Sequence, residues 1–360
     1  MTSILTNGSA TIALQTLRAI NGELDATNRR LSTGQRIGSA ADGAAYWAIA
    51  ATLRGDNGSL SAVTDAMNLD RNAVEAAYAG LTMVVDALGA MSRSLVAAKS
   101  EQVDRAKIQL DIVTAQKAMR TFAEGAVMNG NNWLSVRSDT PGFAVETSLV
   151  AAFSRQGGTA TVSTFALDTS GFILFDNKPR VVAPSDWVEP SNTPALPQMT
   201  AIVASIAASV SATSDPSLRL TYFDTPTHTH NHGLLDSAYL FTPPGVSRAR
   251  DSFSIQSLDI TPDYVTTGMI DVYLKVVDAT MQKLIAGASV LGASAKLLES
   301  QQTFAKQLMD INTSSIGSLV DADVEEESMR LRALQTQQQL GIQALSIANT
   351  RGQTLLSLFR

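Results

Sequence analysis

The chain has 360 residues, of which 45% are hydrophobic and 17% charged, and its formal net charge is −6. This composition is typical of a globular protein, and the negative charge argues against nucleic acid or a membrane surface as a partner. Cysteine is absent, which excludes disulfides, thiolate metal sites and cysteine catalysis. We expect no stretch apolar enough to span a bilayer and no signal peptide of the Sec type.

The positions of the prolines divide the chain. All eleven lie between Pro141 and Pro262. Because proline disrupts a helix interior, the two proline-free arms, residues 1–140 and 263–360, are expected to form long helices around an irregular or β-rich insert.

The first terminal segment, residues 10–31, carries apolar residues at heptad steps, interrupted by Asn21 and Asn28. Ile12 and Ile20 lie off this seam, so the helix is apolar on more than one side. The seam residues are Ala10, Leu14, Leu17, Leu24 and Leu31.

Both long arms then show a sustained heptad stripe, and a shorter helix over about residues 103–126 has the same rhythm. Two such seams from opposite ends of a chain bury each other most simply as an antiparallel coiled coil. A helical bundle closed within one molecule fits the periodicity equally well. In the first arm the stripe is Leu60, Val63, Met67, Asp70, Val74, Ala77, Leu81, Val84, Leu88, Met91, Leu95 and Ala98. In the second it is Ile270, Leu274, Val277, Met281, Leu284, Ala288, Leu291, Ala295, Leu298, Gln302, Ala305 and Met309.

The insert between the arms has a different pattern. Alternating β-branched and apolar residues over 143–153 and 159–167 predict a hairpin, Met199–Val210 a short helix and Phe253–Ile260 a returning strand. Since eight of the eleven phenylalanines lie in this block, we expect it to have its own small core. The fold class is therefore mainly α: a long antiparallel coiled coil or helical bundle formed by both chain ends, with an inserted smaller α+β or mostly β outer domain.

The last segment, residues 331–359, shows the same interrupted heptad pattern as the first terminal segment. Leu331, Leu334, Leu345, Ala348, Leu355 and Phe359 follow the heptad, and Gln338, Gly341 and Gly352 interrupt it. Off-seam residues again include large apolar ones, among them Ile342, Ile347 and Leu356. Chain ends are normally frayed and polar, so ends of this kind are expected to meet neighbours from other molecules.

Three stretches in these arms resemble the flagellins. The segment LSTGQRIGSAADGAA, residues 31–45, is similar to the family's spoke between the first two helices, and residues 349–360, NTRGQTLLSLFR, resemble its C-terminal end. The acidic run DADVEEE, residues 321–327, also looks like the family, and Ala44-Ala45-Tyr46-Trp47 is similar to flagellins of rhizobia and related alpha-proteobacteria. The resemblance covers both arms.

The resemblance implies a structural subunit that self-assembles into the extracellular bacterial flagellar filament for swimming. It implies terminal core helices over 1–40 and 320–360, a coiled-coil bundle over 41–140 and 263–319, and a variable outward-facing domain over 141–262. Implied partners are other copies or sister flagellins, an export chaperone, and hook-associated and cap proteins. The residues expected to make contacts between subunits are Leu14, Leu17, Leu24, Leu31, Arg36, Ile37, Asp42, Leu331, Leu334, Leu345, Ile347, Leu355, Leu356 and Phe359.

Residues that carry chemistry are scarce. The three histidines, His228, His230 and His232, alternate in THTHNHG, a spacing that would let imidazoles share Zn²⁺ or Ni²⁺, although a solvated loop is the simpler interpretation. No motif of a nucleotide-binding or hydrolytic enzyme occurs. We therefore expect no catalytic residue, no metal and no cofactor. The alternatives left open are a flagellin-like hook–filament junction protein and a surface binding module carried on the insert.

Overall fold

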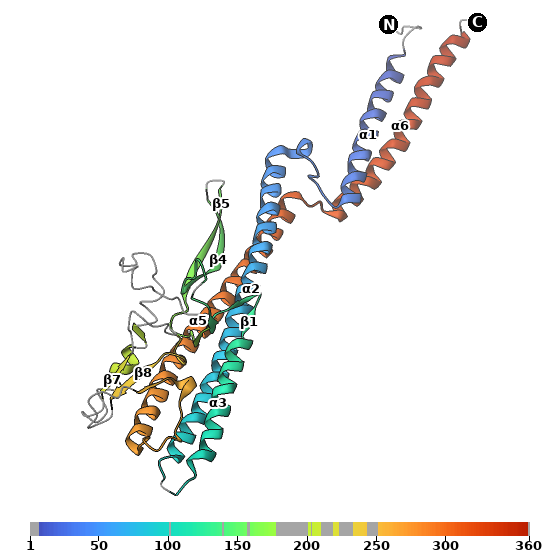
Figure 1. Ribbon diagram of the computed structural model, residues 1–360. Coiled ribbons are helices and arrows are strands. Elements are labelled where there is room, and N and C mark those ends of the chain that lie inside the picture. The colour runs from blue at the N-terminus through green and yellow to red at the C-terminus, as the bar shows by residue number, and fades with distance from the viewer. Residues whose placement is uncertain are drawn as a thin grey trace. The chain divides into compact units, whose positions relative to one another are not determined.

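The computed structural model describes residues 7–358 except for 101, 139, 157–158, 178–200, 203, 210–218, 223–232 and 243–250. Long helices dominate it, and each lies in one of the two proline-free arms (Figure 1). They are α1 (Gly8–Thr33), α2 (Ala40–Ala97), α3 (Arg105–Gly125), α5 (Thr267–Val320) and α6 (Val324–Leu358).

Local signals set the ends of these helices. The Asn7 side chain accepts a hydrogen bond from the Ala10 amide at 3.1 Å and caps α1, and Asp104 caps α3 in the same way. Gly34 ends α1 in the left-handed conformation with φ 68°, which only glycine adopts without steric cost.

The strands are short apart from one hairpin. β4 (Glu146–Gln156) and β5 (Thr159–Asp168) pair antiparallel, as the alternating sequence predicts. Three strands form an antiparallel sheet in chain order: β7 (Arg219–Tyr222), β8 (Tyr239–Thr242) and β9 (Asp251–Phe253). The remaining pairs are β1 (Val127–Met128) with β2 (Asn131–Asn132), antiparallel, and β3 (Ser135–Val136) with β6 (Phe175–Asp176), parallel.

The chain divides into two compact units, which we describe separately. Residues 1–61 and 306–360 form the terminal unit, and residues 62–305 form the central unit.

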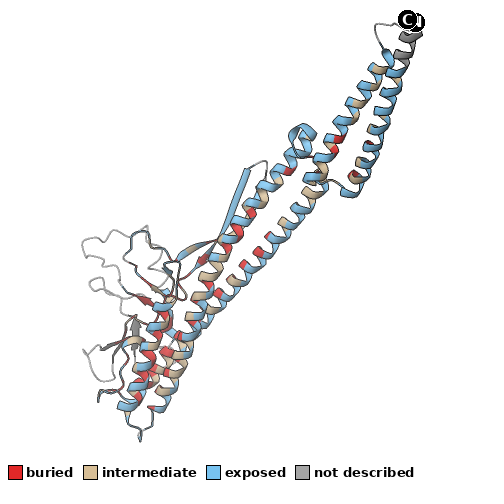
Figure 2. Ribbon diagram, turned by 90° about the vertical axis from the view of Figure 1, so that its right-hand side faces the viewer, coloured by how far each residue is buried: buried red, intermediate tan, exposed pale blue. Residues whose placement is uncertain are grey.

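The central unit is a helical bundle closed along the predicted heptad seams. Figure 2 shows the buried residues, coloured red, at intervals along the helices. Every predicted seam residue from Val63 to Leu95 in α2, and Ala98 just after it, is buried except Asp70, which is half-buried. Lys99 forms an ion pair with Asp271 at 2.7 Å, and Ser92 contacts Asp278 at 3.4 Å. Residue numbers therefore rise along α2 as they fall along α5, so the antiparallel arrangement is confirmed.

The one polar seam residue of α2 positions the hairpin. An Asp70 carboxylate oxygen accepts a hydrogen bond from the Val150 amide at 2.7 Å. Val150 stands next to a bulge, where the β4–β5 register shifts between residues 150 and 152. The carboxylate thus satisfies a strand amide that would otherwise lie unpaired at the sheet edge.

The buried residues of the insert belong to the core of the bundle, which differs from our expectation of a separate core. Leu149, Leu167 and Phe172 lie in one continuous cluster with α2, α3 and α5. A side chain at Gly287 of α5 would place its Cβ 3.1 Å from the Cβ of Phe172, so this glycine permits the close contact. Among the described residues of the central unit, a minor cluster of Val136, Val145 and Ile173 with Phe143 stands apart.

Other expectations for the insert are met in part. Residues 201–202 and 204–209 are helical within the predicted helix, but the predicted strand over Phe253–Ile260 is wrong, because β9 ends at Phe253 and a 3₁₀ turn follows over Ile255–Ser257. The Ser254 side chain accepts from the Ser257 amide and caps that turn. The proline-rich stretch 179–197 lies outside the described residues.

We expected no stretch apolar enough to span a bilayer, and this is wrong for α2, which is long and apolar enough by length and composition alone. This helix contains an 18-residue window of mean hydropathy 1.3. The seam residues of α2 are buried against other helices of the central unit, and 33% of that apolar window is buried.

Candidate assembly surfaces

Within the terminal unit, α1 and α6 lie side by side and run antiparallel (Figures 1 and 2). The Asn7 side-chain amide donates to the Ala348 carbonyl oxygen at 2.9 Å at one end of the pair. At the other end Arg30 forms an ion pair with Glu327 at 3.1 Å. Between them Gln338 donates to the Asn21 side-chain oxygen at 2.7 Å. The sequence positions of these contacts fix one continuous register.

The seam between α1 and α6 is narrow. Leu24, Thr27, Glu327 and Leu334 are buried along it, while most of the other seam residues remain partly exposed. The half-buried seam residues are Ala10, Ala13, Leu17, Ile20, Leu31, Leu331, Gln338, Gly341, Leu345 and Ala348. Polar groups occupy several seam positions, so apolar burial between the two helices is limited.

Large apolar side chains lie on the outer surface of this pair. Ile12 is 67% exposed, Leu340 59% and Ile347 60%, and Leu14 and Ile342 are also exposed. Several large exposed apolar side chains on one helix pair are typical of an interaction site. The pair is therefore a candidate surface for contact with further helices.

The predicted contact residues fall into two groups in this unit. Leu17, Leu24, Leu31, Leu331, Leu334 and Leu345 lie along the seam between α1 and α6, whereas Leu14 and Ile347 point to solvent. The backbones of Leu355 and Leu356 belong to α6, but their side chains lie outside the description, as does Phe359 altogether.

Sequence reasoning missed part of the seam. Ile20 was placed off it and is half-buried on it, and Ala13 and Thr27 complete the alternating three- and four-residue steps. The whole seam can be found by following these three- and four-residue steps without requiring a large apolar residue at each one. Gly341 is small where Leu17 packs, since a Cβ there would lie 3.3 Å from Leu17 Cγ.

A joint connects α1 to α2 and binds the end of α5. The Arg36 and Ile37 amides both donate to the Val320 carbonyl oxygen, at 2.7 and 3.2 Å, and the Ala322 amide donates to the Gly34 carbonyl oxygen at 2.9 Å. The Arg36 guanidinium donates to the Leu319 carbonyl oxygen at 3.0 Å. The last carbonyls of α5, which a helix leaves unpaired, are thus satisfied by the joint.

Ile37 anchors the joint in a small apolar cluster. Its side chain is buried with Ala50 of α2 and Val320 of α5. Ile316 and Leu319 pack against this cluster.

Asp42 organises the start of α2. One carboxylate oxygen accepts hydrogen bonds from the Gly38 amide and from the amide and hydroxyl of Ser39, at 2.9–3.2 Å. The hydrogen bonds from Ser39 lower the pKa of Asp42 below its usual range, because they favour the charged form. Gly43 follows with non-helical φ 170° and ψ 87°, so the first turn of α2 is kinked from the rest. Arg36, Ile37 and Asp42 therefore come together at one junction.

No group suited to chemistry emerges among the described residues. Within them, no three His, Cys, Asp or Glu side chains are arranged to hold a metal ion. His228, His230 and His232 lie outside the described residues, so a metal site there stays a prediction.

Both arms match models of one protein family. Residues 4–138 match the bacterial flagellin N-terminal helical region, and residues 274–359 match the bacterial flagellin C-terminal helical region. Over the full length of both chains, this chain is 38% identical to flagellin C of Rhizobium meliloti strain 1021. The chain belongs to the flagellin family. This flagellin is also 35% identical to flagellin A of Rhizobium meliloti and 31% identical to a flagellin of Brucella melitensis, in each case over the full length of both chains.

Family membership confirms the resemblance seen in residues 31–45 and 349–360. It makes this flagellin a structural subunit of the bacterial flagellar filament, a self-assembled polymer that serves motility. The matched regions contain the whole of the narrow α1–α6 pair.

Proposed function

We propose that this flagellin polymerises mainly through the α1–α6 pair, which packs against the corresponding pairs of neighbouring subunits. The observation that carries this proposal is the large apolar surface left open on both helices, at Ile12, Leu14, Leu340, Ile342 and Ile347. One antiparallel partner covers only one side of each helix, so burying these residues requires other subunits.

The joint gives this arrangement its geometry. Arg36 and Ile37 bind the end of α5 through backbone and side-chain contacts, and Asp42 fixes the start of α2. We assign residues 1–40 and 320–360 to the filament core and residues 41–140 and 263–319 to the next shell. Residues 141–262 project outward in this scheme.

The same assignment implies how the subunit is exported, where the polymer lies and which proteins it binds. The subunit is secreted through the flagellar export route with a dedicated chaperone on its C-terminal helix, and the polymer stands outside the cell. Hook-associated and cap proteins bind the ends of the filament, and sister flagellins can share it. The relatives are structural proteins by name, and we assign this chain no catalytic activity, metal or cofactor.

The test compares polymerisation of three full-length chains by electron microscopy and sedimentation at rising salt. The unaltered chain is expected to form filaments. Leu340→Gln, Ile342→Gln and Ile347→Gln combined should leave a monomer of unchanged helix content that does not elongate, because these side chains are exposed in one subunit. A matched control changes Thr336, Gln339 and Gln343, exposed polar residues of the same helix, to Ala.

The control should polymerise like the unaltered chain. Filaments of normal amount and stability from the triple Gln variant would show that the assembly surface lies elsewhere.

A further inference from the structure

Four asparagines of the chain are each followed by a glycine: Asn7, Asn21, Asn57 and Asn129. Because glycine has no Cβ, its backbone nitrogen can approach the preceding side chain without steric hindrance. An asparagine in this position can lose its side-chain amide to that nitrogen when the side chain and the backbone after it are free to move. The structure restrains the four pairs to different degrees.

Two of the pairs belong to α1, and other groups hold their asparagine side chains. The Asn7 side chain accepts from the Ala10 amide at 3.1 Å and donates to the Ala348 carbonyl oxygen at 2.9 Å. The Asn21 side-chain oxygen accepts from the Gln338 side chain at 2.7 Å. Both side chains are therefore fixed while α1 and α6 stay paired.

Asn57 is held by three hydrogen bonds within α2 and α5. Its side-chain nitrogen donates to the Met309 carbonyl oxygen at 3.3 Å and to the Thr313 hydroxyl at 3.1 Å. Its side-chain oxygen accepts from Asn312 at 2.9 Å. Gly58 lies in the interior of α2, so an attack by its nitrogen requires the helix to open locally.

Asn129 differs from the other three. With Gly130 it forms the two-residue turn between β1 and β2, where both residues are exposed and have positive φ, 52° and 81°. This is the combination that a type I′ turn requires and that asparagine and glycine adopt most easily. Within the described part of the chain, no hydrogen bond holds the Asn129 side chain.

The turn also needs little free energy to open. β1 and β2 pair over only two residues each, and Val127 is 51% exposed. Few buried contacts therefore oppose the local motion that brings the Gly130 nitrogen against the Asn129 side chain.

Water is the only other reactant that the chemistry needs. The Gly130 nitrogen attacks Cγ of Asn129, so that an N–Cγ bond forms and the Cγ–Nδ2 bond breaks. Ammonia leaves with the proton that the backbone nitrogen releases. Water then opens the cyclic imide at either carbonyl carbon and leaves aspartate or isoaspartate, with no change of oxidation state.

We propose that Asn129 is a site of spontaneous deamidation in the folded protein, whereas Asn57 persists. Each conversion replaces a neutral amide by a carboxylate and changes the formal net charge of −6 by one negative unit. The reaction requires only the folded central unit, so this inference goes beyond the proposed function and does not depend on polymerisation.

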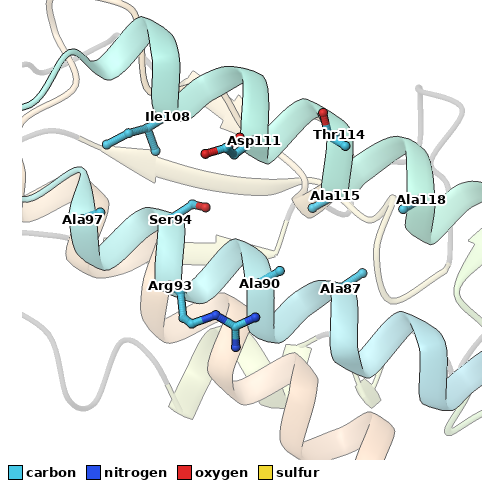
Figure 3. A pocket seen from close by; sticks show the side chains of 10 residues that line it. All are labelled: Ala87, Ala90, Arg93, Ser94, Ala97, Ile108, Asp111, Thr114, Ala115 and Ala118. Atoms are coloured by element: carbon cyan, nitrogen blue, oxygen red, sulfur yellow. The ribbon is translucent and has the colours of Figure 1, made fainter.

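The new charge falls in a pocket of the central unit. Two hollows on its described surface differ in their linings. A groove of about 570 Å³ between α2 and α3 has alanines of both helices on its walls and no amide side chain (Figure 3). A pocket of about 340 Å³ is lined by Asp70, Asn129 and Trp133, among others. Deamidation thus adds a second carboxylate to the pocket that already contains Asp70, and like charges repel there.

The test incubates the full-length protein in heavy-oxygen water at mildly alkaline pH, because the attacking nitrogen must lose its proton and the new oxygen comes from water. Trypsin then releases residues 121–137, which contain Asn129, and residues 55–71, which contain Asn57. Fragment mass spectra locate the label in each peptide. The same incubation in urea gives the rates of the unfolded chain.

In the folded protein, label should enter Asn129 at least about 10-fold faster than Asn57, because the turn opens at a lower free energy than the helix interior. In urea the two rates should be similar. Equal rates in the folded protein would overturn the inference. So would an Asn129 that stays unlabelled in the folded protein while it converts fully in urea.

The matched variant Asn129→Gly removes the reacting amide and keeps a residue suited to positive φ. Its helix content should be unchanged, and its 121–137 peptide should stay unlabelled. Label that persists in this peptide would show that Asn131 or Asn132 reacts instead, which would contradict the assignment to Asn129.

Discussion

Replacing Phe172 by alanine tests whether the insert and the helical bundle share one core. Phe172 is 1% exposed and lies in the cluster that contains the seams of α2, α3 and α5. Its contact with α5 is close, because the position of a Cβ on Gly287 lies only 3.1 Å from the Phe172 Cβ. Truncating a buried phenylalanine costs about 3–5 kcal/mol of unfolding free energy.

The assay is urea unfolding of the monomer in a background with Trp47→Phe and Trp187→Phe, which leaves Trp133 as the single tryptophan. Far-ultraviolet circular dichroism follows the helices, and Trp133 fluorescence follows the insert side. With a urea dependence of about 3 kcal/mol per molar, the midpoint should fall by about 1–2 M. Both probes should shift together, because one core unfolds as one cooperative unit. Phe304→Ala is the matched control, since Phe304 is 54% exposed on α5, and it should change stability by less than about 0.5 kcal/mol.

The reasoning would be refuted by a helical transition that stays at the unaltered midpoint while the fluorescence transition moves. The insert would then be a separate folding unit, as its phenylalanine content alone had led us to expect.

Three further predictions concern other parts of the molecule. Arg30→Ala should weaken the α1–α6 pair by about 1–3 kcal/mol, because it leaves the largely buried Glu327 carboxylate without its cation, whereas Glu327→Gln should cost less; melting temperatures of the two variant filaments would compare these costs. Burial raises the pKa of Asp236 to about 7, against about 3.9 in an unfolded chain, so its contribution to stability is full below about pH 4 and is lost as the pH rises to 7. Asp236→Asn should flatten that decline in urea midpoints measured between pH 5 and pH 8, and an equally steep decline would contradict the assignment. Replacing residues 151–163 with Asn-Gly should leave polymerisation unchanged, since residues 154–155 and 159–163 are exposed, and should lower monomer stability only slightly, because residues 151–153 are half-buried; a loss of filaments would assign the hairpin a role in contacts.

The sequence was most informative where one period governs a long helix. The stripe from Val63 to Ala98 is buried almost as predicted, because a 3.5-residue repeat allows only one seam per partner. Along α1 the same reasoning placed Leu14 on the seam, where it is exposed, and Ile20 off the seam, where it is half-buried. The seam of α1 contains both large and small residues, so side-chain size alone does not identify a seam position.

Contacts between distant segments could not be derived from periodicity. The role of Asp70 depends on a strand amide about eighty positions away in the chain, at Val150. The burial of Phe172 against α5 depends on the missing side chain of Gly287, and the heptad period does not single out that position.

The central claim is that the terminal helices complete their packing in the polymer. Amide hydrogen exchange along α1 and α6, measured on the monomer and on the filament, tests it most directly. The narrow seam of Leu24, Thr27, Glu327 and Leu334 predicts fast exchange in the monomer, because little buried surface opposes local opening. Strong protection over both helices is expected in the filament. Equal protection in monomer and filament would contradict the account, since the pair would then be complete within one chain.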